Sequence, residues 1–224
     1  MDLLLNMQSF CIPLLQVIGI NVILSGDNAV VIALAARSLP PRQQRAAILW
    51  GSGAAVVMRI ILTLFALQLL TLPSLKLIGS VLLLWIGVKL LLSEEEKGEI
   101  ASSSHLLTAI RIIVTADLVM SLDNVIAVAG AVQGNMSLLI LSLVISIPLI
   151  VFGATLLMGV MKRFPIIVTL GAALLGWVAG EMAVGDSAIH GWVTSQLPLL
   201  EKIVPAGGAI LVLLVGKLLN RKRS

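Results

Sequence analysis

Seven long apolar stretches restrict this sequence to one broad class of fold. A helix that crosses a bilayer needs about 20 mostly apolar residues, and such runs lie at 10–36, 46–70, 74–92, 106–132, 137–159, 166–184 and 199–219. Of the 224 residues, 59% are hydrophobic and only 12% are charged, which leaves little chain for a soluble domain. The sequence therefore predicts an all-α polytopic membrane protein, with residues 1–224 forming a single transmembrane domain of seven spanning helices.

The basic residues predict the orientation of these helices, because Lys and Arg accumulate in cytoplasmic loops. With seven spans, most of them fall on one side: Arg37, Arg42, Arg45, Lys89, Lys97, Arg111, Lys162, Arg163, Lys217, Arg221, Lys222 and Arg223. Lys76 and Lys202 fall on the other side. We therefore expect an external amino terminus and a cytoplasmic carboxyl terminus. The basic end "NRKRS" then meets anionic lipid, and no nucleic-acid partner is needed to explain it.

A polar motif recurs in the two halves of the chain. The segment "NVILSGDNAVVIALAAR" at 21–37 aligns without gaps with "DLVMSLDNVIAVAGAVQ", which begins 96 residues later at 117. Three spans per copy is an odd number, so the second copy must enter the membrane from the opposite side. The sequence predicts an inverted repeat of three plus three helices, made of 10–92 and 106–184. A cytoplasmic linker at 93–105 would join them, and the seventh helix at 199–219 lies outside the repeat.

The repeated motif places charged and polar groups inside apolar helices. Its members are Asn21, Ser25, Asp27 and Asn28 in the first span, and Asp117, Ser121, Asp123 and Asn124 in the fourth. Residues spaced by three and four lie on one face of a helix, so each span presents a ladder of oxygen atoms. Three lipid-facing aspartates would cost on the order of 10 kcal/mol, so these groups must face one another, a cation or water. For each serine taken singly, ordinary helix packing is the favoured interpretation.

The charge and chemistry of this cluster favour a divalent cation. Arg59, deep in the second span, is expected to pair with one aspartate as a counter-charge. Three ionised carboxylates and one guanidinium sum to −2. Carboxylate, amide and hydroxyl oxygens suit Mg²⁺, Ca²⁺ or Mn²⁺. Met120 lies on the same face as a softer additional ligand, although packing in the core is the commoner role of such a methionine.

At these residues the chain resembles the TerC family of bacterial membrane proteins, within the lysine-exporter-like superfamily. The features that carry the resemblance are "GDNAVVIALAAR" and "SLDNVIAVAGA". The resemblance implies a protein of the bacterial cytoplasmic membrane that exports Mn²⁺, with the metal as substrate and no resident cofactor. It implies Asp27, Asn28, Asp123 and Asn124 as ion ligands and Asp117 as a further one. Asn21, Ser25, Ser121 and Met120 remain additional candidates, and exchange of the cation for H⁺ is a mechanism that the crowded carboxylates allow.

Three other functions fit some of these features. The wider superfamily suggests export of a cationic amino acid. A membrane assembly factor for secreted enzymes would carry no ion and would have the secretion machinery as its partner. An intramembrane aspartyl protease also pairs aspartates on two spans, but its GxGD pattern is absent from "LSGDNA" and "MSLDNV", so we expect no enzyme. A homo-oligomer is compatible with each of them.

Overall fold

The computed structural model describes residues 18–19, 26–65, 72, 74–92, 103–132 and 136–221, and the regular structure in these residues is helical. The helices are α2 (Gly26–Ala36), α3 (Pro41–Leu64), α5 (Leu75–Leu92), α6 (Ser103–Val132), α7 (Met136–Arg163), α8 (Ile166–Val184), α9 (His190–Gln196) and α10 (Leu200–Arg221). Six of them contain a stretch long and apolar enough to cross a membrane, namely α3, α5, α6, α7, α8 and α10. The apolar helix α2 is shorter, and it is the described part of the first predicted span, together with residues 18–19.

The observed helix ends differ from the predicted spans where polar residues continue a helix. The span predicted at 46–70 begins earlier, at Pro41, because Pro40 precedes the helix with extended backbone and Pro41 occupies its first turn. The segment Arg42–Arg45 is helical but polar, so a hydropathy pattern does not include it. The short helix α9 was not predicted. The span predicted at 166–184 has the same ends as α8.

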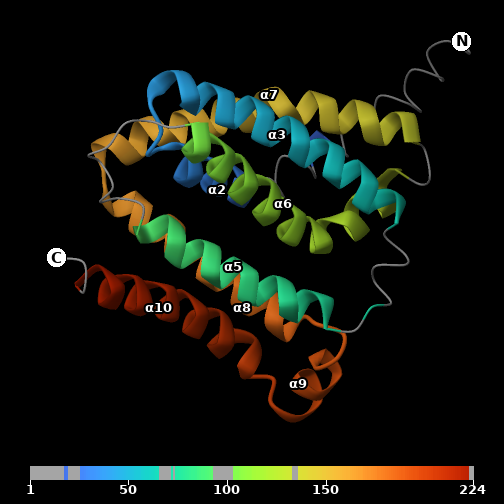
Figure 1. Ribbon diagram of the computed structural model, residues 1–224. Coiled ribbons are helices and arrows are strands. Elements are labelled where there is room, and N and C mark those ends of the chain that lie inside the picture. The colour runs from blue at the N-terminus through green and yellow to red at the C-terminus, as the bar shows by residue number, and fades with distance from the viewer. Residues whose placement is uncertain are drawn as a thin grey trace, which may run out of the picture.

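The helices form two groups (Figure 1). Helices α2, α3, α6 and α7 lie together in the upper part of the view, and α5, α8 and α10 lie together below them. A buried cluster of aliphatic side chains connects the groups, with Leu34, Leu83, Ile113 and Leu175 almost completely buried within it. Many large apolar side chains on the outer surface are exposed, such as Trp50, Val81 and Phe152, as expected where lipid is the solvent.

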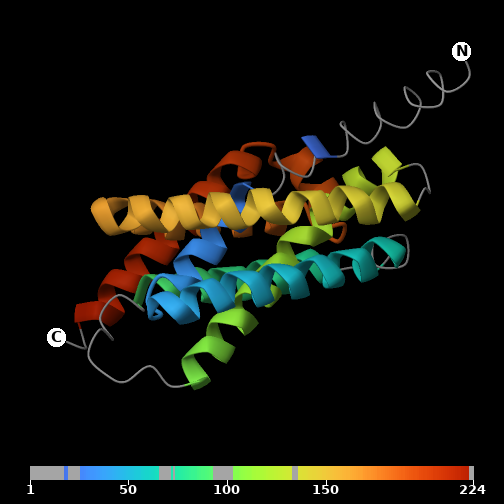
Figure 2. The ribbon, with the colours of Figure 1, turned by 90° about the horizontal axis from the view of Figure 1, so that it is seen from above.

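Contacts between the two halves of the chain come in matched pairs. Helix α3 packs on α6, and its counterpart α7 packs on α2; α5 contacts α6, and its counterpart α8 contacts α2. Helices α3 and α7 also contact each other and run in opposite directions (Figure 2). Gly79 and Gly171, 92 residues apart, each face a helix of the other half: a Cβ at Gly79 would lie 3.0 Å from Val119 of α6, and one at Gly171 would lie 2.9 Å from Val30 of α2. This exchange of partners is the pattern that a two-fold repeat produces.

The helix termini gather the basic residues at one end of the molecule. Helices α3, α6 and α8 begin, and α5, α7 and α10 end, on the left in Figure 1. The described basic residues near these ends are Arg37, Arg42, Arg45, Lys89, Arg111, Lys162, Arg163, Lys217 and Arg221. Lys76 and Lys202 are near the starts of α5 and α10, at the opposite end. The chain is therefore electrically asymmetric along the helix axes.

Candidate ion-binding site

Close packing of α3 on α6 positions the polar groups of the site. A Cβ at Gly51 of α3 would lie only 2.9 Å from the side chain of Ile113, so glycine permits the close approach of the two helices. Ala116 of α6 is completely buried in the cluster between the two groups of helices. Further along the same pair of helices, Arg59 of α3 meets Asp117 and Ser121 of α6.

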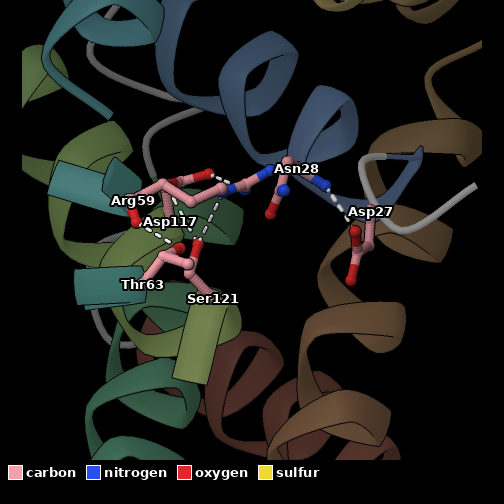
Figure 3. A network of polar contacts seen from close by, with 6 residues as sticks. All are labelled: Asp27, Asn28, Arg59, Thr63, Asp117 and Ser121. Carbon is pink, nitrogen blue, oxygen red and sulfur yellow. Dashed lines mark hydrogen bonds and ion pairs between the residues drawn. The ribbon is translucent and has the colours of Figure 1, made fainter. Parts of the chain in front are cut away.

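Arg59, Asp117 and Ser121 form a closed network of buried charge-assisted bonds (Figure 3). The Arg59 guanidinium donates from Nη2 to Asp117 Oδ1 at 2.5 Å and from Nε to Ser121 Oγ at 3.0 Å. The Ser121 hydroxyl donates to Asp117 Oδ2 at 3.2 Å. Arg59 is only 3% exposed. Both oxygens of Asp117 therefore have partners, and the positive charge of Arg59 has the counter-charge that a buried guanidinium needs.

Arg59 lies in the last third of α3, rather than at the midpoint that a span over 46–70 would give. Thr63, one turn later, donates its hydroxyl to the Arg59 carbonyl oxygen at 2.8 Å. This bond stays within the helix, so Thr63 serves α3 and not the site.

Asp27 and Asn28 face this network from α2. In the view of Figure 3, Asn28 lies between Asp27 and Arg59. Asp27 Oδ1 accepts the backbone N–H of Asn28 at 2.8 Å, and Asp27 lies close enough to Arg59 and Asp117 for electrostatic interaction. The Asn28 side chain is 3% exposed, and neither its Oδ1 nor its Nδ2 has a hydrogen-bond partner among the described residues. A buried amide normally forms hydrogen bonds, so this one has ligand capacity that the described residues do not use.

The other predicted site residues are divided between described and undescribed parts of the chain. Asn21, Ser25 and the side chain of Asp123 lie outside the part that the structure describes. Asn124 follows on α6 and is half-buried. Met120 packs in the aliphatic cluster with 3% exposure. Within the described ranges no three His, Cys, Asp or Glu side chains come together as a metal-binding group.

Sequence reasoning assigned no role to Asp186. It is 1% exposed and joins the loop after α8 to the start of α5. Its Oδ1 accepts the N–H groups of Ser74 and Ala188 at 3.1 and 2.8 Å, and its Oδ2 accepts that of Leu77 at 3.1 Å. Burial acts to raise the pKa of Asp186, but the backbone N–H groups of Ala188, Leu77 and Ser74 together outweigh it and hold the pKa below the usual carboxyl range. Spacing alone could not reveal this, because the partners lie 112 and 109 residues away.

A bundle of apolar helices with a buried cluster of acidic, amide and guanidinium groups defines a multi-pass integral membrane protein. Residues 6–224 match the family described as the integral membrane protein TerC family, and the chain belongs to that family. The family assignment expected from the two DN motifs is therefore confirmed.

Three proteins of Bacillus subtilis (strain 168) are similar to the chain. "Uncharacterized membrane protein YjbE" is 45% identical over 199 residues, covering 86% of this chain and 91% of the relative. "Uncharacterized membrane protein YkoY" is 27% identical over 76% of the chain, which spans 59% of that relative. "Uncharacterized membrane protein YceF" is 26% identical over 75% of the chain and 68% of the relative. No solved structure matches the chain significantly.

Proposed function

We propose that this protein exports a divalent metal cation, Mn²⁺, across the bacterial cytoplasmic membrane. The observation that carries the proposal is the buried Asn28 amide without a partner among the described residues, beside Asp27 and facing Arg59 and Asp117. Carboxylate and amide oxygens are hard ligands that suit such ions. Asp123 and Asn124 repeat the Asp-Asn pair on α6 and would complete the ligand set. Membership of the TerC family supports the choice of manganese.

The proposed mechanism uses the inverted repeat. Matched contacts of α3 with α6 and of α7 with α2 support two copies related by a two-fold axis in the membrane plane. Such repeats alternate access to a central site by moving one half against the other. Seven spans would be completed by the first span at 10–36. The basic end of the molecule supports a cytoplasmic carboxyl terminus. In an exchange of the ion for H⁺, the carboxylates of the site would be protonated, and so neutralised, after the metal ion leaves.

Flux of Mn²⁺ into proteoliposomes that contain a Mn²⁺-quenched dye tests the proposal. The wild-type protein should transport Mn²⁺ above the rate of empty vesicles, and Asp27→Asn or Asp123→Asn should lower the rate at least about tenfold, since each removes a charged ligand. Glu201→Gln is the matched control, because Glu201 is an exposed carboxylate in the first turn of α10. Wild-type flux equal to that of empty vesicles, or a full rate in folded Asp27→Asn protein, would overturn the assignment.

Export of a cationic amino acid is the second candidate, and one observation favours it. Asp117 and Ser121 already bind a guanidinium, that of Arg59, so the site has the chemistry to hold an arginine or lysine side chain. The same vesicles distinguish the two functions. Uptake of labelled lysine that excess Mn²⁺ does not reduce would support the amino-acid exporter. A scaffold for secreted enzymes would transport neither solute.

Cys11 is the single cysteine of the sequence, so the orientation can be tested with introduced cysteines in a Cys11→Ser background. Ser195 is exposed in α9, and Lys162 is exposed near the end of α7, at the opposite end of the bundle. An impermeant maleimide should label Ser195→Cys in intact cells, and should label Lys162→Cys only after lysis. The reverse pattern would invert the proposed orientation.

A further inference from the structure

The two halves of the molecule differ in charge where their folds correspond. Displacement by 96 residues places Asp117 over Asn21, Ser121 over Ser25 and Thr155 over Arg59. Thr155 on α7 is exposed and donates its hydroxyl to the carbonyl oxygen of Val151 within its own helix. The arginine of α7 is Arg163, in its last turn, so the packing of α7 on α2 has no guanidinium to match Arg59 in the packing of α3 on α6. The two halves therefore match in their helix contacts but differ in charge.

Arg59 brings a permanent positive charge to the site. Arginine does not lose its proton in proteins. Its guanidinium is fixed on α6 by Asp117 Oδ1 and Ser121 Oγ, and α2 presents Asp27 and Asn28 on its other side. An ion bound at Asp27 and Asn28 would be repelled by the charge of Arg59. The ion and the guanidinium would also compete for the oxygens of Asp117. Repulsion at short range inside a membrane is poorly screened.

We propose that Arg59 is a tethered counter-cation, whose positive charge lowers the affinity of the site for the ion and so permits its release. The inference rests on the proposed function, because it assigns to Arg59 the affinity of that same site. A transporter must hold its ion strongly enough to select it and weakly enough to release it. Arg59 acts here through Asp117 and through its charge. It is a positioning residue and not an ion ligand.

The test compares Arg59→Gln with Arg111→Gln in purified protein and in proteoliposomes. Arg111 is an exposed arginine of α6, so its substitution removes the same charge away from the site. Mn²⁺ binding is measured from the electron paramagnetic resonance signal of the free ion, and transport gives KM and kcat. Arg59→Gln should bind Mn²⁺ about tenfold more tightly, with a lower KM and a lower kcat, because release becomes slower. Arg111→Gln should match the wild type in all three quantities.

A purely structural role for Arg59 predicts a different result. Folded Arg59→Gln protein would then bind Mn²⁺ with the wild-type affinity or more weakly, and its KM would not fall; either outcome overturns the inference. Should Arg59→Gln fail to fold, Asp117→Asn is compared with the double variant Arg59→Gln/Asp117→Asn, which contains two neutral amides. The double variant should bind Mn²⁺ about tenfold more tightly than Asp117→Asn, and equal affinities would refute the proposal.

Failure of this inference differs from failure of the proposed function. Wild-type protein that neither binds nor transports Mn²⁺ disproves the function, and the role of Arg59 falls with it. If the wild-type protein binds and transports Mn²⁺ but the variants gain no affinity, the proposed function stands. Only the proposed role of Arg59 is then disproved.

Discussion

Replacement of Asp186 tests how distant segments hold the end of α5. The carboxylate accepts three backbone N–H groups, from Ser74, Leu77 and Ala188. In Asp186→Asn the carbonyl oxygen can still accept two of them, but the amide NH₂ group faces the third donor. In Asp186→Ala all three donors lose their partner in a site that is only 1% exposed in the wild type.

The expected cost follows from these counts. A buried donor left without a partner costs about 1–3 kcal/mol. We therefore expect a destabilisation of about 2 kcal/mol in Asp186→Asn, where one donor loses its acceptor, and about 4–6 kcal/mol in Asp186→Ala, where all three donors lose theirs; the charge is lost in both variants. For a chain of this length, 1 kcal/mol corresponds to about 2–4 °C in Tm, so Asp186→Asn should melt about 4–8 °C below the wild type.

Thermal unfolding in detergent, followed by circular dichroism or by the four tryptophans, measures this difference. Glu201→Gln is the control, since it neutralises an exposed carboxylate near the same end of the bundle. The reasoning is refuted if Asp186→Asn melts within 1 °C of the control, or if Asp186→Ala is no less stable than Asp186→Asn.

Two further predictions follow from the same structure. Because folding lowers the pKa of Asp186, its contribution to stability is complete above the ordinary carboxyl pKa of about 3.9 and is lost as the pH falls through the lower folded value. The Tm difference between the wild type and Asp186→Asn should therefore stay constant from about pH 8 to pH 5 and shrink below about pH 4. A Tm difference independent of pH would contradict this. On α10, a Cβ at Gly208 would lie 3.1 Å from the Gly176 carbonyl carbon of α8, and closer still to its oxygen, whereas one at Gly207 would meet nothing within 4 Å. Gly208→Ala should therefore destabilise the protein by about 1–3 kcal/mol, measured by thermal unfolding; Gly207→Ala should be neutral or slightly stabilising, and equal effects of the two would show that α8 and α10 are not in close contact.

The sequence predicted the helices because long apolar runs are a local property. The span at 166–184 is reproduced residue for residue by α8, and the repeated Asp-Asn motif correctly indicated the TerC family. Helix ends were less well predicted. The first turn of α3 is polar and α9 is short, so neither has the hydropathy of a span, although prolines 40 and 41 were a visible signal for the earlier start of α3.

The partners of the charged groups could not be read from the sequence. A buried arginine was expected to pair with an aspartate, but the sequence offers three aspartates and does not distinguish among them. Packing of α3 on α6 at Gly51 brings Arg59 to Asp117. Asp27 instead remains beside Asn28 on α2. Asp186 gave no signal at all, since its burial depends on how the loop after α8 meets α5.

The amino-acid sequence by itself therefore determined which segments are apolar helices and which of them carry ionisable groups, because both depend on residue type and spacing along one segment. Tertiary structure decided which charges are neutralised and which polar atoms lack a partner among the described residues. Those properties depend on distances between groups that are 58 residues apart in the case of Arg59 and Asp117, and 112 in the case of Ser74 and Asp186. The close approach of helix backbones sets these distances, and it is a property of the packed bundle and not of any one helix.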